Sequence, residues 1–128
     1  MTLINVSIVI PFKAEEDKIS IWMQKRESAD ELNGMLEFPG GKIDINETPI
    51  EAAIREVREE TGVKLDISKL KLNRTFENSL QNKTILLNIF TYQCNQEFSS
   101  GWYRADDTAS FFEYIPPANK LFIEDVIK

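Results

Sequence analysis

Histidine is absent from this chain of 128 residues, and cysteine occurs once, at Cys94. Without histidine, a Ser-His-Asp triad, a Cys-His catalytic pair and a histidine-ligated zinc site are all excluded. One cysteine cannot form an internal disulfide. Because Cys94 ends an apolar run, we expect a buried thiol in or beside a strand.

A basic surface and a long apolar run are also missing. The net charge is −6 and the sequence pI is about 4.7, which argues against polymeric nucleic acid as a partner. A single nucleotide whose phosphates are partly neutralised by a divalent metal remains compatible with this charge. The first apolar run, residues 3–12, is far shorter than the roughly 20 residues of a membrane-spanning helix, and the residues before it lack the features of a signal peptide. We therefore expect a cytoplasmic protein with no membrane partner, as a monomer or weak dimer.

The pattern of apolar residues predicts one domain over residues 1–128 with both strands and helices. Strands are expected at residues 3–12, 18–24, 35–38, 71–77 and 84–94. A last helix is expected to begin after Pro116 and Pro117. Strands, a helix, more strands and a last helix are typical of an α/β or α+β sandwich.

The central helix has well-marked ends. Thr48 is placed as N-cap with Pro49 at the first helical position and Glu51 three residues on, which predicts a capping box. Gly62 stands where a left-handed residue commonly ends a helix. At 100° per residue, one apolar stripe is formed by Ile50, Ala53, Ile54 and Val57.

Three glutamates share a sector beside that stripe: Glu56, Glu59 and Glu60. Like charges three or four residues apart on a helix repel each other, and the helix dipole disfavours anions at this end. A solvated charged face is the ordinary interpretation of such a run. The convergence of three carboxylates after a Gly40-Gly41 turn instead favours a site for Mg²⁺, or alternatively Mn²⁺, since both ions prefer oxygen ligands.

These residues resemble a complete Nudix box. The pattern is Gly, five residues, Glu, seven residues, then Arg-Glu-apolar-any-Glu-Glu-any-Gly-apolar. It is filled by Gly41, Glu47, Arg55, Glu56, Val57, Glu59, Glu60, Gly62 and Val63. The resemblance implies an α/β/α sandwich with a mixed β-sheet between helices, and hydrolysis of nucleoside diphosphates linked to another group.

The flanking residues are similar to the MutT-like branch of this family. The similarity includes residues 36–43 (LEFPGGKI) and 116–119 (PPAN), covers nearly the whole chain and is weak between residues 65 and 115. It implies Mg²⁺-dependent hydrolysis of oxidised purine deoxynucleoside triphosphates such as 8-oxo-dGTP to monophosphate and pyrophosphate, which cleans the nucleotide pool.

The resemblance also implies roles for single residues. The metal ligands would be Glu56, Glu59, Glu60 and the carbonyl of Gly40. Arg55 would orient a glutamate through a salt bridge, and Glu47 would support the loop and helix around it. The same glutamates would serve catalysis, joined by Glu97 if that residue replaces a glutamate that such enzymes place on a loop before a late tryptophan. The spacing from Glu97 to Trp102 fits this place only approximately, so an ordinary loop carboxylate is the alternative.

Substrate contacts are implied for Arg26, Phe38, Lys42 and Asn119. Asn119 matches an asparagine that reads the guanine edge, for which an amide offers both a donor and an acceptor. A helix N-cap is the other interpretation of Asn119, a core aromatic that of Phe38, and a surface arginine that of Arg26.

Two further functions remain open. The chain could prefer a cytidine or other nucleoside triphosphate within the same chemistry. It could also be a nucleotide-binding sensor without turnover, although a pure binder does not need all three glutamates.

Overall fold

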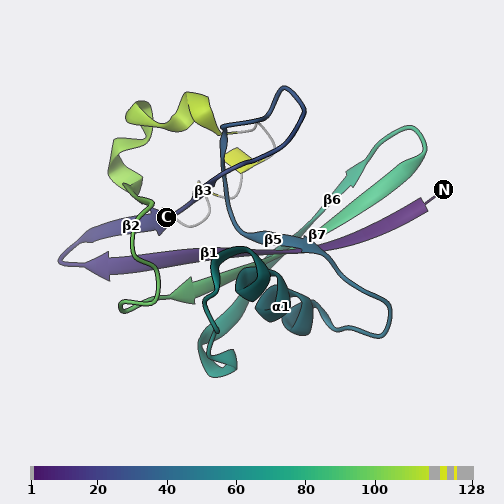
Figure 1. Cartoon of the computed structure of the whole chain (residues 1–128), viewed down its shortest axis with the longest axis horizontal. Coiled ribbons are helices and arrows are strands. Elements are labelled where there is room, and N and C mark those ends of the chain that lie inside the picture. The colour runs from purple at the N-terminus through teal and green to yellow at the C-terminus, as the bar shows by residue number, and fades with distance from the viewer. Residues whose placement is uncertain (1, 116–118, 121–122, 124–128) are drawn as a thin grey trace. The chain divides into compact units, whose positions relative to one another are not determined.

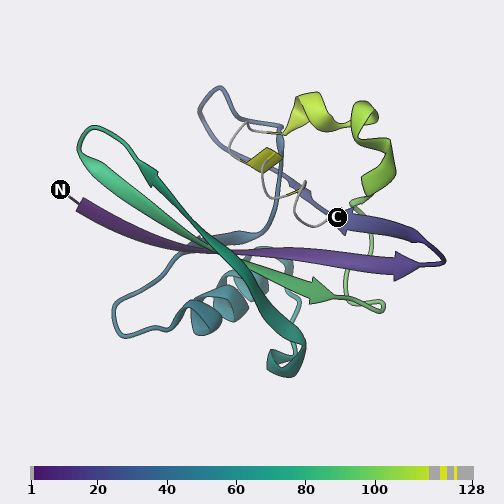
Figure 2. The same cartoon turned by 180° about the vertical axis from the view of Figure 1, so that it is seen from behind.

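The computed structural model describes residues 2–115, 119, 120 and 123 (Figures 1 and 2). Two compact units are distinguished within it, Met1–Ile10 with Pro39–Gln93, and Pro11–Phe38 with Cys94–Lys128. Strand β1 (Thr2–Glu15) contributes to both units. The single domain over residues 1–128 stays a prediction.

The first unit is built on a sheet in which β7 (Lys83–Gln93) lies between β1 and β6 (Leu70–Ser79). β6 and β7 pair antiparallel, and β5 (Gly40–Lys42) pairs antiparallel with β1, so that Ser7 faces Gly41. The arrows of β1 and β7 point the same way in both views, so the sheet is mixed (Figures 1 and 2). The strands predicted at residues 3–12, 71–77 and 84–94 are confirmed.

The helix of the first unit, α1 (Pro49–Thr61), has the predicted ends. Thr48 accepts a hydrogen bond from the backbone of Glu51 and donates its own backbone N–H to the Glu51 side chain, and Gly62 adopts φ 80°. The helix packs against β5, and the buried Ser7 hydroxyl donates a hydrogen bond of 2.7 Å to the carbonyl of Pro49. The first turn of α1 is therefore tied to β1.

The buried face of α1 differs from the predicted stripe. Ala52, Ala53 and Val57 are fully buried, whereas Ile50 and Ile54 are only half-buried. The packed side extends toward Ala52, and so toward the glutamate side of the helix. Small residues there allow a close approach of the helix to its neighbours, which a count of large apolar residues does not reveal.

The second unit contains the end of β1, β2 (Lys18–Trp22) and β8 (Trp102–Arg104), in that order in the sheet. β1 and β2 form a hairpin whose two turn residues, Glu16 and Asp17, both have positive φ, as a two-residue hairpin turn requires. The prediction of one strand over residues 18–24 is wrong at its end. Met23 leaves the ladder to donate its N–H to the carbonyl of Gly101, and the chain continues in a separate pair, β3 (Gln24–Lys25) with β4 (Leu36–Glu37).

Three short 3₁₀ helices complete the described elements: η1 (Ile67–Lys69), η2 (Ala105–Ser110) and η3 (Phe112–Tyr114). Residues 119, 120 and 123 are helical, and the remainder of the helix predicted after Pro116 and Pro117 lies outside the described residues. Cys94 is buried and is not part of a disulfide, as expected. In the part of the chain that the structure describes, no helix is both long and apolar enough to cross a membrane.

Candidate active site

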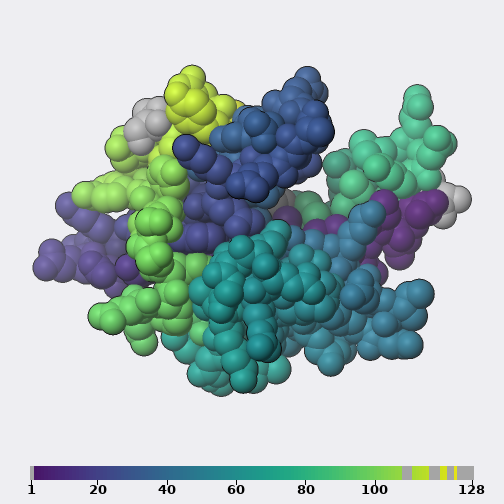
Figure 3. All heavy atoms as spheres, viewed as in Figure 1, coloured from purple at the N-terminus to yellow at the C-terminus, as the bar shows by residue number. Residues whose placement is uncertain are grey.

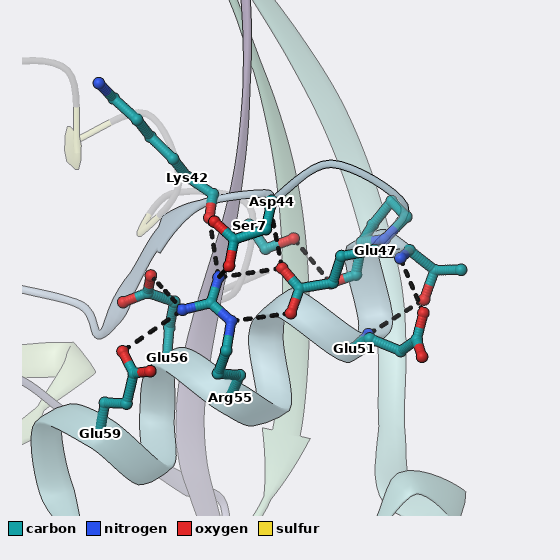
Figure 4. Close-up of polar contacts among 10 residues, drawn as sticks. Ser7, Lys42, Asp44, Glu47, Glu51, Arg55, Glu56 and Glu59 are labelled. Atoms are coloured by element: carbon teal, nitrogen blue, oxygen red, sulfur yellow. Dashed lines mark hydrogen bonds and ion pairs between the residues drawn. The ribbon is translucent and has the colours of Figure 1, made fainter.

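Arg55 is the centre of a charged cluster on α1 (Figure 4). Its Nε and Nη2 donate to the two oxygens of Glu47 at 2.7 and 2.9 Å. Its Nη1 donates to Glu56 at 3.0 Å and to Glu59 at 3.3 Å. Nη2 also reaches the backbone carbonyl of Lys42 at 3.0 Å. One guanidinium therefore connects the helix to the loop that precedes it, and both lie at the molecular surface (Figure 3).

Glu47 is held more firmly than any other carboxylate of this cluster. Its two oxygens receive the paired donors of Arg55, and the backbone N–H of Asp44 donates to it at 3.0 Å. These bonds stabilise the charged form, and they lower the pKa of Glu47 from its ordinary value near 4.5 to about 2. The pKa of Arg55 is raised in turn, first by the bonds to Glu47. The pair keeps its charges over the whole range in which the protein would work.

This pKa shift predicts a pH dependence of stability. In the unfolded chain Glu47 takes up a proton near pH 4.5, whereas in the folded chain it does so only near pH 2. Its contribution to the free energy of unfolding is therefore complete above about pH 4.5 and is lost as the pH falls toward 2. Glu47→Gln removes that contribution. We expect urea unfolding to show the variant less stable than wild type at neutral pH, with a difference that shrinks below about pH 4.5. A difference that is constant down to pH 2 would contradict the assigned pKa.

The third glutamate, Glu60, is bound to Gly40, the first residue of β5. Its Oε2 accepts a hydrogen bond of 2.9 Å from the backbone N–H of Gly40. Gly41 lies against Glu56 so closely that an added Cβ would stand 2.5 Å from the Glu56 carboxyl carbon. An added Cβ on Gly40 would stand 2.2 Å from the carbonyl oxygen of Ser7. Neither position has space for a side chain, and the two glycines let β5 approach both β1 and the helix carboxylates.

The donor set of this cluster suits a hard divalent cation. Arg55 bonds only Oε1 of Glu56 and only Oε2 of Glu59, so a second oxygen of each faces away from these bonds. Glu56 is 18% exposed and Glu59 is 60% exposed. The space beside Gly41 is occupied by the Glu56 carboxylate itself. Carboxylate oxygens beside a backbone turn are ligands that Mg²⁺ and Mn²⁺ accept. Within the described ranges, however, no three acidic side chains already converge on one point that could hold an ion, so binding would require the carboxylates to turn toward it.

Lys42 takes part in the cluster through its backbone. Its carbonyl accepts from Arg55, while its exposed side chain points away from the guanidinium (Figure 4). The role expected from the sequence, a substrate contact, concerns that side chain and stays a prediction.

Four other candidate residues belong to the second unit: Arg26, Phe38, Glu97 and Asn119. Arg26 is paired with Asp30 at 3.1 Å and with Glu37 at 3.6 Å, and burial raises the pKa of Glu37. Phe38 is buried, with 6% of its surface exposed. Ordinary structural residues also form such ion pairs and occupy such buried positions. The substrate roles of Arg26 and Phe38 therefore stay predictions.

Glu97 and Asn119 complete that group. The backbone N–H groups of Asn95 and Gln96 donate to Oε1 of Glu97 at 2.8 and 2.9 Å, so this carboxylate organises its own loop. Asn119 is helical and half-buried. The catalytic role of Glu97 and the role of Asn119 in base recognition remain predictions.

One member of the cluster has no counterpart in the sequence prediction. Asp44 lies 3.5 Å from Nη2 of Arg55 and closes a turn with Glu47, whose N–H donates to the Asp44 carbonyl at 3.1 Å. Asn46 within this turn has φ 69°, a conformation that asparagine tolerates better than most residues. The position of Asp44, five residues before the first residue of α1, was the available signal, because Asp and Asn favour turns.

A comparison with protein-family models identifies the family of the chain. The model of the NUDIX domain matches residues 1–119. The chain therefore belongs to the Nudix family, and the resemblance of residues 41–63 to its motif is confirmed. Nudix hydrolases generally use divalent metal ions.

Several curated relatives of the chain are named 8-oxo-dGTP diphosphatase. A protein of Proteus vulgaris called 8-oxo-dGTP diphosphatase is 34% identical over 71 residues, which are 56% of this chain and 62% of that protein. An 8-oxo-dGTP diphosphatase of Haemophilus influenzae is 29% identical over 114 residues, 84% of this chain and 81% of the relative. The match to the Proteus protein thus spans less than two thirds of its length.

Solved structures agree on the fold. A MutT Nudix hydrolase from Burkholderia pseudomallei superposes with a TM-score of 0.72 at 20% identity, over 98% of this chain and 99% of the other. A structure from a study of MutT of Aliivibrio salmonicida and Vibrio cholerae gives a TM-score of 0.72 at 22% identity, over 98% of each chain. The expected Nudix-type α/β fold with a mixed sheet is confirmed.

Proposed function

We propose that the chain is a nucleoside triphosphate pyrophosphohydrolase that releases monophosphate and pyrophosphate, with oxidised purine nucleotides such as 8-oxo-dGTP as preferred substrates. The observation that carries the proposal is the network of Arg55, which bonds Glu47, Glu56 and Glu59 of the motif, while Glu60 accepts from the N–H of Gly40. The name 8-oxo-dGTP diphosphatase, shared by relatives over most of the chain, supports the substrate class.

Glu56, Glu59, Glu60 and the Gly40 carbonyl would hold a divalent cation, with Mg²⁺ the ion of choice. Such an ion neutralises charge on the triphosphate and makes water a better nucleophile at neutral pH. The bidentate bond from Arg55 to Glu47 fixes the guanidinium, which then aligns Glu56 and Glu59. Glu60 is aligned by the N–H of Gly40. Once the carboxylates have turned toward the ion, these bonds would limit further reorganisation during the reaction.

In the chemical step one P–O bond forms, one P–O bond breaks and one proton is transferred. Water attacks phosphorus at the β position, its proton passes to one of the three glutamates, and the bond from the β phosphorus to the oxygen bridging it to the α phosphate breaks. The α phosphate keeps that oxygen and leaves as nucleoside monophosphate, and the other two phosphates leave as pyrophosphate. Since the chain contains no histidine, we assign the role of base to a glutamate.

The test is a substrate panel. We would measure kcat/KM with Mg²⁺ for 8-oxo-dGTP, dGTP, dCTP and 5-methyl-dCTP, identify the products, and repeat the assay in excess chelator. We expect preference for 8-oxo-dGTP, formation of pyrophosphate, and loss of turnover in chelator. A preference for a cytidine nucleotide would support the proposed reaction but contradict the proposed substrate. If triphosphates bind but none is hydrolysed, the chain is a nucleotide-binding sensor and not an enzyme.

A further inference from the structure

Ser7 is a fully buried polar residue inside an apolar strand. It lies in β1 among Val6, Ile8 and Val9, and none of its surface is exposed. Serine is found mostly at protein surfaces, and burying a hydroxyl costs free energy unless the group is hydrogen-bonded. An alanine or a valine would fill a strand interior without that cost. A contact of the hydroxyl must therefore compensate for its burial.

The partner of the Ser7 hydroxyl is in the helix. The hydroxyl donates a hydrogen bond of 2.7 Å to the carbonyl of Pro49, the first residue of α1 (Figure 4). A helix start leaves N–H groups without an intrahelical partner, not carbonyls, and Thr48 already accepts from one of these N–H groups. The Ser7 bond is therefore not a cap that the helix requires. Its effect is to fix where the first turn of α1 lies on β1.

The backbone of the same residue contacts β5. Ser7 is opposite Gly41 in the ladder between β1 and β5. An added Cβ on Gly40 would collide with the carbonyl oxygen of Ser7, so the two backbones are in close contact there. Because the side chain of Ser7 bonds α1 and its backbone pairs with β5, this one residue relates the position of the helix to that of the two glycines.

Two carboxylates of the candidate site depend on that position. Glu60 accepts the 2.9 Å bond from the N–H of Gly40, and the Glu56 carboxylate is packed against Gly41. Glu56 is seven residues after Pro49, about two turns along the helix. Rigid helices carry structural coupling over such distances. A displacement of the first turn would therefore move both carboxylates relative to β5.

Other restraints on this part of the helix are weaker. The buried residues of its first half, Ala52 and Ala53, are small and make few van der Waals contacts that would resist sliding. The bond of 3.0 Å from Arg55 to the Lys42 carbonyl is exposed, so water competes for it. The Ser7 hydroxyl is excluded from water, where a hydrogen bond is electrostatically stronger. Of these two bonds, that of Ser7 is the firmer restraint.

We propose that Ser7 is a positioning residue for the metal-binding glutamates. It holds α1 at the place along β5 where Glu56 lies against Gly41 and Glu60 bonds Gly40. It acts through the helix and touches neither the substrate nor the ion. The proposal rests on the proposed function, in which these glutamates bind the catalytic cation.

Binding of Mn²⁺ without nucleotide tests this role apart from turnover. The whole chain is titrated with Mn²⁺ and the free ion is measured by EPR, for wild type and Ser7→Ala, at a temperature where circular dichroism shows both proteins fully folded. We expect Ser7→Ala to raise the Kd for Mn²⁺ by about fivefold, the equivalent of one ordinary hydrogen bond. An equal Kd in both proteins, or a wild type that binds no Mn²⁺, would overturn the proposal.

Turnover provides the second measurement. At saturating Mg²⁺ we expect kcat of Ser7→Ala to be about tenfold below that of wild type, because small displacements in a catalytic arrangement already reduce the rate. Tyr92→Phe is the matched control. It also removes one buried hydroxyl of the first unit, which accepts a bond of 2.9 Å from the N–H of Asp66, beyond the end of α1.

We expect this control to lose stability in urea but to keep the Mn²⁺ affinity and the kcat of wild type. Equal losses of affinity and kcat in Ser7→Ala and Tyr92→Phe would show that both effects follow stability, and the positioning role of Ser7 would be wrong.

The two proposals can fail separately. Weaker Mn²⁺ binding in Ser7→Ala, together with no triphosphate turnover by wild type, would retain the positioning role and remove the enzyme. Turnover by wild type, together with an unchanged Kd and kcat in Ser7→Ala, would retain the enzyme and remove the role of Ser7.

Discussion

Glu59→Gln is expected to lower kcat for the preferred triphosphate by about 10²- to 10⁴-fold, the range for loss of a group that positions or transfers a proton. The substitution keeps the size of the side chain and removes the negative charge. A neutral amide is a poorer ligand for a divalent cation and cannot act as base. The folded state should hardly change, because Glu59 is 60% exposed and its bond to Arg55 is an exposed ion pair of 3.3 Å, which contributes less than about 1 kcal/mol.

Steady-state kinetics and urea unfolding of the same preparations measure the two effects. The matched control is Glu51→Gln on the same helix. It removes one negative charge but retains a side-chain oxygen that can accept the hydrogen bond from the N–H of Thr48, and glutamine is an accepted partner in a capping box. We expect the control to turn over substrate like wild type. Near-normal kcat in Glu59→Gln, or an equal loss in both variants, would remove Glu59 from the site.

The parts of the structure that follow from contiguous sequence were predicted well. The caps of α1 depend on Thr48, Glu51 and Gly62, which act on backbone groups within four residues. Strand β7 shows its apolar pattern within its own residues. The three carboxylates were predicted to lie on one side of the helix, and Arg55 indeed contacts two of them. Such features are set by local geometry, so the sequence alone contains the necessary information.

The parts that depend on distant residues were not predicted. The break at Met23 requires the carbonyl of Gly101, which is distant in sequence. The bond from Arg55 to the Lys42 carbonyl involves a backbone atom that every residue type has, so no residue type indicates it. The bond from the Ser7 hydroxyl to the first turn of α1 joins residues 42 positions apart, which only the fold brings together. Hydrophobic patterning identifies faces but does not specify which faces meet.

The two glycines of β5 also illustrate this limit, and they yield the second large effect. Gly40 and Gly41 were predicted to form a turn, whereas the structure places both in β5, paired with β1, and gives them different neighbours. A Cβ on Gly41 meets the carboxylate of Glu56 at 2.5–2.7 Å, whereas a Cβ on Gly40 meets the backbone of Ser7 and Ile8 at 2.2–3.1 Å. A side-chain end can move aside, but two paired strands cannot.

Gly41→Ala is therefore expected to remain folded and to lose activity. The new methyl group displaces the Glu56 carboxylate from its position beside β5, and a misplacement of about 1 Å in a catalytic arrangement can cost about 10²-fold in rate. We expect a kcat loss of at least this size, with a decrease in the free energy of unfolding of about 1–3 kcal/mol, as for a moderate overpacking. Kinetics at a temperature where the variant is fully folded, with urea unfolding alongside, measure both.

Gly40→Ala, one residue earlier, provides the contrast. Its methyl group collides with the carbonyl of Ser7, so β5 must separate from β1 at the pair formed by Ile8 and Gly40. We expect this variant to lose more than about 3 kcal/mol of stability, since neither backbone can relax without breaking the ladder. If instead Gly41→Ala unfolds and Gly40→Ala stays stable, the contacts of the two glycines are assigned the wrong way round. If Gly41→Ala is folded and fully active, the position of Glu56 beside β5 is not what catalysis requires, and the metal would have to be held by Glu59 and Glu60 without it.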